Sequence, residues 1–295
     1  MKQPCGALRR GLLAIFVFWI SHATHAEAQV FRGPESAALG GTGVAGLQGS
    51  EAALLNPALI PLFEGSGFDA FFRDGDQDVG QHRQAIGLGA IDNSRDVWFP
   101  GTLHYLRLRD TGRSPQPANG ELWQLGFGEK AGDHFALGIS GSWLVYDLKG
   151  IGRITQFNYS VGGIYMVNSS LGVAYVLRNL ALPGSEVPAG LREDLQQVVG
   201  VFAAVTDLAR LRLDILRQER LNPEHKMAYM FGFESKTSPF FVLRLGYRYD
   251  DLTGQRFWTA GVGFDGPRLK ANYSFEKNQD RVSGAMHSVD LVLPF

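Results

Sequence analysis

Histidine and serine are the residues of this chain that could supply a catalytic base and a nucleophile. Ser140 and Ser142 lie shortly after His134, and a base beside a hydroxyl is how a membrane hydrolase activates its nucleophile. The sequence around them matches no motif of such a hydrolase. A histidine in a loop or at a membrane interface is the simpler interpretation, so we do not expect an enzyme.

Metal, thiol and phosphate chemistry also lack support in the sequence. The single cysteine, Cys5, lies in a segment that we expect to be removed (see below), and the run Gly40–Gly43 lacks the lysine of a phosphate-binding loop. Five of the seven histidines lie outside that segment. They occur singly, without the H-x-x-x-H or H-E-x-x-H spacing of a zinc site. They are His82, His104, His134, His225 and His287. The expectation is therefore no metal and no cofactor.

Eight charged residues in the second half of the chain fall on the polar positions of segments in which polar and apolar residues alternate. They are Arg210, Arg212, Asp214, Arg244, Arg248, Lys270, Glu276 and Asp290. The whole chain is nearly neutral, with 28 Lys+Arg against 29 Asp+Glu, which gives no reason to expect a nucleic-acid partner. The chemistry of these eight residues depends on which elements carry them.

The alternation has a period of two, which is the period of a β-strand because successive side chains point to opposite faces of a sheet. Phe240–Tyr249, Phe257–Asp265 and Arg268–Glu276 all show it. A soluble β-sandwich and a transmembrane antiparallel β-barrel would both produce this pattern. Aromatic residues near the segment ends, and segment lengths of about nine to eleven residues, favour the barrel.

In a barrel the eight charged side chains must face the lumen, since Arg or Lys facing lipid at mid-depth costs about 2–4 kcal/mol. Two interpretations stay open for them. They could form a ladder that tunes which solutes pass, or pairs of Arg with Asp or Glu that brace the wall. The local excess of Arg favours a preference for anions or carboxylates, whereas the balanced total favours bracing.

Fourteen such segments follow one another, and bacterial single-chain barrels have an even strand number. The segment Leu191–Val205 would also suit a helix. The predicted strands are 67–73, 83–91, 102–109, 121–128, 134–146, 153–167, 171–180, 195–205, 209–217, 227–234, 240–249, 257–265, 268–276 and 286–295.

The connections support an outer-membrane orientation. If Phe295 ends in the periplasm, the turns on that side, such as Gly266-Pro267, are short. The predicted external loops, such as Asp74–His82 and Asn179–Asp194, are generally longer, which is the rule for outer-membrane barrels. We therefore expect the cell outer membrane, with its lipid around the wall and both termini in the periplasm.

The beginning of the chain reads as a secretory signal. Basic residues precede the apolar run Gly11–Ile20, and Ala26-Glu27-Ala28 offers a small-x-small cleavage site, with cleavage after Ala26 or Ala28. The expected organisation is a cleaved signal peptide over 1–28, an N-terminal segment over 29–64 and a barrel over 65–295.

The segment Gly33–Phe63 is rich in Gly and Ala and shows no two-residue alternation. Ser50 is a candidate N-cap for a short helix that Asn56-Pro57 would end, and Pro57 with Pro61 would prevent a regular strand. It is either a plug inside the barrel or a loosely packed periplasmic leader.

This segment resembles the hatch of the FadL-type long-chain fatty-acid transporters, and more closely that of the PorV/PorQ-like proteins, which carry the pattern LG-x-G-G/T-x-V-A … A-x-x-x-N-P-A-x-L. The matching residues are Leu39, Gly40, Gly41, Gly43, Val44, Ala45, Ala52, Ala53, Asn56, Pro57 and Ala58. The resemblance implies a barrel of about fourteen strands with the hatch inside or beneath it. It also implies that the terminal Phe295 is a signal for the barrel assembly machinery.

Two functions follow from the resemblance. The FadL-type proteins imply passive transport of hydrophobic or small amphipathic solutes. The PorV/PorQ-like proteins imply a non-transporting accessory subunit of a secretion machinery, which holds or shuttles exported proteins. The chain lacks the large external loops with which the fatty-acid transporters capture their ligands, which favours the accessory role. The sequence shows no partner machinery, however, so passive transport is the predicted function and the accessory role is the alternative. No motif in the sequence identifies the solute or the protein partner.

Overall fold

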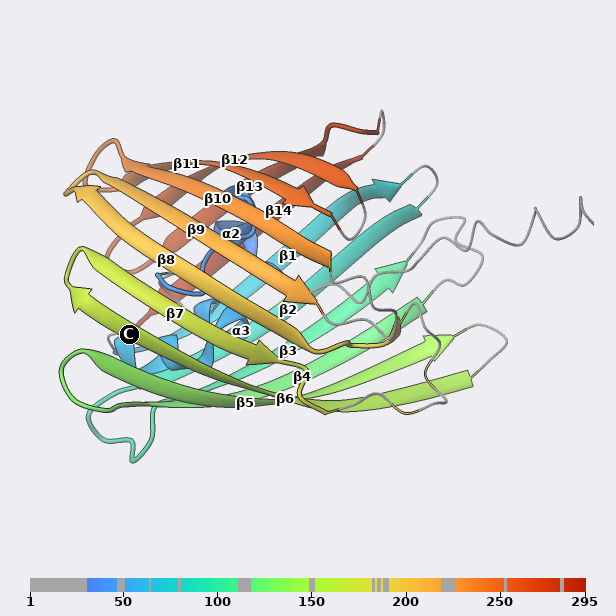
Figure 1. Cartoon of the computed structure of the whole chain (residues 1–295), viewed down its shortest axis with the longest axis horizontal. Helices are drawn as coiled ribbons and strands as arrows, with labels where there is room; N and C mark the ends of the chain where they lie inside the picture. Colours follow the sequence, from blue (N-terminus) through green and yellow to red (C-terminus); the bar gives the residue numbers. More distant parts are fainter. Residues whose placement is uncertain are drawn as a thin grey trace, which may run out of the picture.

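A computed structural model describes residues 31–46, 51–63, 65–78, 81–110, 118–148, 152–181, 184, 187, 191–218, 226–251, 254–281 and 284–295. The predicted signal peptide and Ser50 lie outside these ranges. The described residues form one β-barrel that encloses a short N-terminal segment (Figure 1).

Fourteen antiparallel strands pair in sequence order, and β1 pairs with β14 to close the sheet. This confirms the predicted transmembrane-type barrel over the sandwich. The strands are β1 Gly65–Asp78, β2 Gln81–Asn93, β3 Gly101–Asp110, β4 Ala118–Lys130, β5 Phe135–Leu148, β6 Gly152–Asn168, β7 Leu171–Arg178, β8 Gln196–Thr206, β9 Ala209–Gln218, β10 Lys226–Lys236, β11 Phe241–Asp250, β12 Gln255–Asp265, β13 Lys270–Asn278 and β14 Ala285–Pro294.

The two ends of the barrel differ in their connections. We call the end at which β14 finishes the short-turn end, and the opposite end the long-loop end. Two-residue turns join β6 to β7 and β8 to β9 at the short-turn end, whereas the β7–β8 connection at the long-loop end runs from 179 to 195. Figure 1 shows the C-terminus among the tight turns.

Some predicted boundaries are wrong. The sequence predicts a loop over Asp74–His82, but β1 continues to Asp78 and pairs there with Gln81 of β2. Beyond the apolar band both faces of a strand are polar, so the alternation ends before the hydrogen bonding does. The ambiguous segment Leu191–Val205 is a strand only from Gln196.

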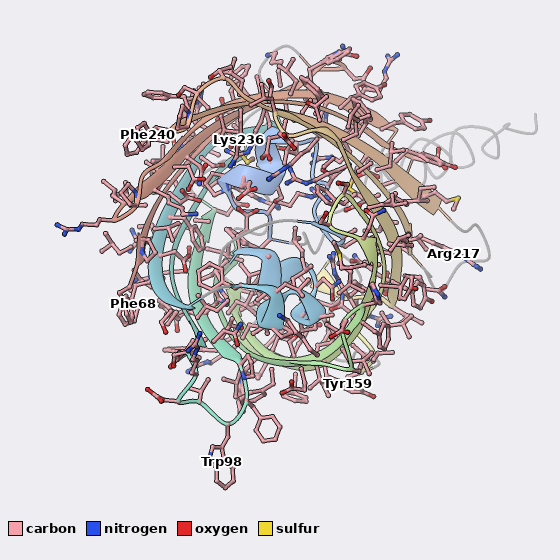
Figure 2. The ribbon with its side chains drawn as sticks, turned by 90° about the vertical axis from the view of Figure 1, so that its left-hand side faces the viewer. Phe68, Trp98, Tyr159, Arg217, Lys236 and Phe240 are labelled. Atoms are coloured by element: carbon pink, nitrogen blue, oxygen red, sulfur yellow. The ribbon has the colours of Figure 1, made fainter. Side chains whose placement is uncertain are left out.

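The outer face of the barrel is apolar and the inner face polar, as the alternation predicts. On β11, Leu243 and Leu245 are 48% and 57% exposed, whereas Arg244 between them is 7% exposed. Figure 2 shows Phe68, Tyr159 and Phe240 pointing away from the ring of strands.

Aromatic side chains gather toward both ends of this outer face. Tyr105 and Trp123 lie 4.6 Å apart between ring centroids toward the long-loop end, while Phe68 and Phe295 lie 5.2 Å apart at the short-turn end. Rings with an apolar body and a polar edge favour the membrane–water interface, so two such bands match the borders of a hydrocarbon layer.

The N-terminal segment lies inside the ring of strands (Figures 1 and 2) and we call it the hatch. It contains α2 (Pro34–Ala38), α3 (Glu51–Leu55) and the 3-10 helix η1 (Pro57–Leu62). The Asn56 side chain accepts a hydrogen bond from the backbone N–H of Ala58 and so caps η1. None of the helices in the described ranges is long and apolar enough to cross a membrane.

Inward-facing glycines let the hatch backbone approach the wall. An added Cβ at each of seven wall glycines would lie 2.0–2.6 Å from a hatch atom. We call these seven the glycine belt: Gly128, Gly138, Gly162, Gly200, Gly232, Gly246 and Gly261. A Cβ on Gly138 would lie 2.2 Å from the carbonyl carbon of Pro57, and one on Gly246 would lie 2.1 Å from the amide nitrogen of Gly40. At these two positions the nearest atoms belong to the hatch backbone, so a larger residue must displace backbone.

The belt predicts a position-specific effect on β5. We expect Gly138→Ala to destabilise hatch docking by about 1–3 kcal/mol, because the methyl group overpacks a rigid contact. Hydrogen–deuterium exchange of residues 51–62 in the folded barrel measures this. Gly141→Ala is the matched control, since it lies on the same strand, faces outward, and its Cβ would come no closer than 3.7 Å to Phe157. Equal exchange in both variants would refute the belt.

Candidate functional site

The structure places the eight sequence-predicted charged residues on the inner face of the wall. Six of them are buried: Arg212, Asp214, Arg244, Arg248, Glu276 and Asp290. The side chains of Arg210 and Lys270 are 22% and 36% exposed, respectively. Lys270 pairs with Asp265 at 2.8 Å where β12 turns into β13, at the short-turn end. The eight residues do not form one site, but divide among separate clusters.

The first cluster centres on Glu234 of β10. One carboxylate oxygen accepts from Arg244 Nε at 2.9 Å and from Arg212 Nη1 at 3.4 Å, while the other accepts from Arg210 Nη1 at 3.2 Å. Antiparallel pairing of β9, β10 and β11 brings these residues together, since Glu234 lies opposite Arg210 on one side and Arg244 on the other. One carboxylate therefore balances three neighbouring guanidinium groups.

The second cluster centres on Glu276 of β13. Arg73 Nη2 lies 2.7 Å from one of its oxygens and Arg248 Nη1 lies 3.3 Å from the other. Arg73 also donates to the backbone carbonyl of Arg32 at 3.1 Å, which ties the start of the hatch to β1. The four arginines predicted from alternation are thus all paired with carboxylates, which favours bracing of the wall.

Wall side chains also hold the hatch backbone directly. Asp214 Oδ2 accepts from the N–H groups of Gly43 and Val44 at 2.7 and 3.1 Å. The Thr259 hydroxyl donates to Ala38 O and accepts from Gly40 N, both at 2.9 Å. Asp214 is therefore a tether for the hatch turn.

The hatch turn needs the glycines that the sequence singled out. Gly40 and Gly41 have φ of 71° and 90°, in the left-handed region that favours glycine. Asn56 joins the two arms of the hatch, because its Nδ2 donates to Val44 O at 2.7 Å while its Oδ1 caps the helix that begins at Pro57. The motif residues Gly40, Gly41, Gly43, Asn56 and Pro57 thus shape one turn and one helix start.

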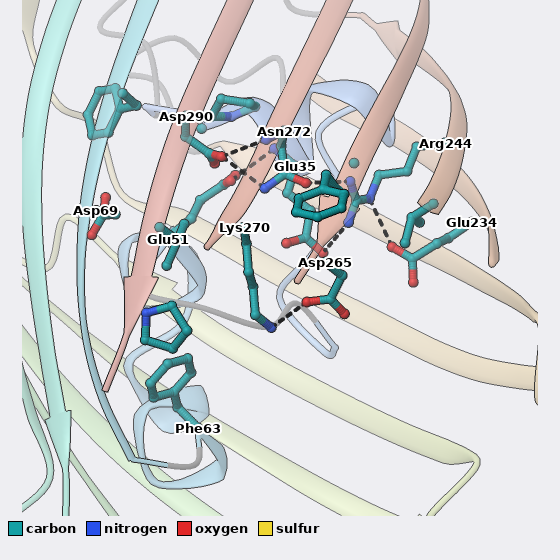
Figure 3. A pocket seen from close by; sticks show the side chains of 18 of the residues that line it. Glu35, Glu51, Phe63, Asp69, Glu234, Arg244, Asp265, Lys270, Asn272 and Asp290 are labelled. Carbon is teal, nitrogen blue, oxygen red and sulfur yellow. Dashed lines mark hydrogen bonds and ion pairs between the residues drawn. The ribbon is translucent and has the colours of Figure 1, made fainter. Parts of the chain in front are cut away.

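A pocket lies beside the hatch at the short-turn end, bounded by α2, α3, β1 and β9–β14 (Figure 3). Its cavity volume is about 60 Å³, and the empty space rises to about 860 Å³ when the open mouth is included. Phe31, Phe63 and Phe71 line it together with both charged and aliphatic side chains. Its charged residues are Glu35, Glu51, Asp69, Glu234, Asp265 and Asp290 against Arg210, Lys236, Arg244 and Lys270.

Hydrogen bonds connect much of one wall of this pocket. Asp290 Oδ1 accepts from the backbone N–H and the Nδ2 of Asn272, and Asn272 Oδ1 accepts from Arg244 Nη1 at 2.7 Å. Arg244 then reaches Glu234 and, at 3.6 Å, Glu35 of the hatch. Figure 3 shows this chain of contacts running from β14 to β10.

Several pocket residues were absent from the sequence-based candidates. Asp69 and Glu234 occupy the polar positions of their strands, so the alternation could have identified them. Glu35 and Glu51 lie on the hatch, where polar and apolar residues do not alternate, so the sequence does not indicate where their side chains point. Burial, and secondarily the nearby Glu35 carboxylate, raises the pKa of the Glu51 side chain to about 8.

The serines and the histidine considered for catalysis are not arranged as a catalytic pair. His134 is an exposed residue of the turn before β5, with Nδ1 2.8 Å from Met166 O, and Ser140 is buried facing the lumen. Within the described ranges no three His, Cys, Asp or Glu side chains are arranged to hold a metal ion.

Comparison with known proteins gives structural neighbours and no sequence match. No family model and no curated protein matches the chain. The solved structure of the CymD monoaromatic hydrocarbon channel is 14% identical, with a TM-score of 0.69 over 92% of this chain and 99% of that chain. The Pseudomonas putida toluene transporter TodX is 12% identical, with a TM-score of 0.67 over 90% and 99%. A Pseudomonas aeruginosa FadL homologue is 12% identical, with a TM-score of 0.66 over 90% and 98%.

This chain has the FadL-type barrel fold. The fold predicted from the hatch motif and the strand count is therefore confirmed. In this FadL-type barrel the ion pairs around Glu234 and the contacts of the glycine belt hold the same hatch to the wall from different strands.

The Glu234 cluster predicts a large stability effect. We expect Glu234→Gln to lower the free energy of unfolding by about 3–5 kcal/mol, because three guanidinium groups lose their shared carboxylate in a buried site. The temperature at which the folded band disappears on a detergent gel reports the change. Asp280→Asn is the control, as it breaks the exposed Arg256–Asp280 pair and should have little effect. Comparable losses in the two variants would contradict the assignment.

Proposed function

We propose that this chain is an outer-membrane barrel through which hydrophobic or small amphipathic solutes cross passively. The shared fold supports this, since the neighbours are described as a hydrocarbon channel and toluene transporters. The short-turn end would face the periplasm, as short periplasmic turns are the rule in outer-membrane barrels.

One observation on this chain carries the proposal. At the long-loop end, inward-facing apolar side chains gather on β5 and at the start of β6. Leu144, Tyr146, Leu148 and Ile154 form a buried cluster there with Val187 and Leu191 of the β7–β8 connection. These six side chains are 2–8% exposed, so this end of the lumen is built to hold apolar groups, which is the property that a path for hydrophobic solutes needs.

The close packing of the hatch against the wall favours a second function. The glycine belt spans strands from β4 to β12, and the arginine clusters add further contacts, so the hatch is firmly held and fills much of the lumen. A filled barrel suits an accessory subunit of a secretion machinery, which would offer its surface to a partner and conduct nothing.

Deletion of Ala37–Ile60 separates the two functions. A barrel of this size is wide enough to conduct once its plug is removed. For a transporter we expect the deletion to raise single-channel conductance in a planar bilayer and to abolish saturable uptake of radiolabelled toluene by cells that express it. The intact chain should take up toluene faster than cells with an empty vector. If neither form conducts nor takes up toluene, the accessory role is favoured.

A further inference from the structure

The pocket beside the hatch is lined by more acidic than basic side chains. Six carboxylates and four basic side chains line it. Lys270 is paired with Asp265 near the mouth, and Arg210 and Arg244 are both paired with Glu234. Three of the four basic side chains are thus already paired with carboxylates of the wall.

Two of the buried carboxylates have no basic partner among the described residues. Glu51 accepts from the backbone N–H groups of Glu35 and Ser36, both at 3.0 Å, and forms no ion pair. Asp290 is 6% exposed and accepts through Oδ1 only from Asn272. Its Oδ2 has no partner in the described part of the chain and lies in the lining of the pocket. A buried carboxylate without a cation is costly, and a positive ligand would relieve that cost.

The remaining lining favours an organic cation over a metal ion. Phe31, Phe63 and Phe71 come from the hatch and β1, and Val242 and Val292 face the same space from β11 and β14. An ammonium group near aromatic rings gains electrostatic attraction to the ring faces, and its hydrocarbon body gains from apolar contact. A hydrated divalent ion would gain nothing from such walls.

We propose that this pocket binds a small organic cation, an alkyl- or arylalkyl-ammonium. Its charged group would lie against Asp290, with Glu51 nearby, and its hydrocarbon body would lie against the phenylalanine rings. The site is defined by the cavity and its charges, so it does not depend on the transport function proposed above. A carboxylate ligand of the same size would face Asp290 and would be repelled. The raised pKa of Glu51 agrees with a carboxyl group that lacks a positive neighbour.

Titration calorimetry on the purified full chain in a neutral detergent tests this with three probes that share one body. They are 2-phenylethylammonium, 2-phenylethanol and phenylacetate. We expect the wild-type protein to bind the ammonium compound at least about tenfold more tightly than either other probe, because a hydrogen bond to a charged group adds that much selectivity. Equal affinity for the ammonium compound and the alcohol would overturn the proposal, as it would indicate hydrophobic partition alone.

Three variants locate the site. Asp290→Asn keeps the size of the side chain and the acceptor for Asn272, and should weaken ammonium binding by about tenfold or more. Val292→Trp fills the pocket from the same strand without changing its charge and should also abolish binding, so the test survives if one variant misfolds. Asp280→Asn removes a carboxylate at the long-loop end and should bind as the wild type does. Wild-type affinity in folded Asp290→Asn or Val292→Trp would place the ligand elsewhere and refute the site.

Discussion

Pairing of β1 with β14 is the contact on which the rest of the structure depends. It runs from Gly67 opposite Pro294 to Gly75 opposite Met286, and Phe295 extends it through two backbone hydrogen bonds to Ser66. In hydrocarbon an unpaired backbone group costs several kcal/mol, so an open edge is not tolerated. Closure also makes a lumen whose inner surface cannot pack against itself. The interior therefore needs its own contents, and the hatch supplies much of them.

The wall and the hatch meet by two complementary means. Over β4 to β12 the wall has glycines where the hatch comes close. Because glycine has no side chain, the hatch can pack directly against the wall backbone there. Between these positions it presents long charged side chains, such as Arg212, which donates to Gly46 O at 2.9 Å. Each device needs the other, because side chains at the belt would exclude the hatch and glycine at the arginine positions would leave hatch carbonyls unpaired.

The strands were predictable because each one lies between two different environments, and a period of two records that difference in the sequence. The ends of the strands were less predictable. β1 and β2 continue past the apolar band, where side chains on both faces are polar, so Asp76 and His82 do not indicate which face they lie on. Glycines at the polar positions, such as Gly232 and Gly246, already indicated a crowded lumen. Their contacts with Thr42 and Gly40 were not predictable, because those contacts join distant parts of the chain. Glu35 and Glu51 escaped prediction for the same reason: only the folded hatch places them beside Arg244 and Asp290.

The lumen has two ends of different chemistry, and this limits what could use both. Toward the long loops the buried cluster around Leu144 and Tyr146 is largely apolar. Beside the hatch the pocket combines phenylalanine rings with Asp290 and Glu51, which a pure hydrocarbon cannot satisfy. A hydrocarbon fits the first environment and leaves buried carboxylates uncompensated in the second. A molecule with a hydrocarbon body and one positive charge would find a favourable partner in each, so the apolar cluster and the proposed ammonium site favour the same class of amphipathic cation.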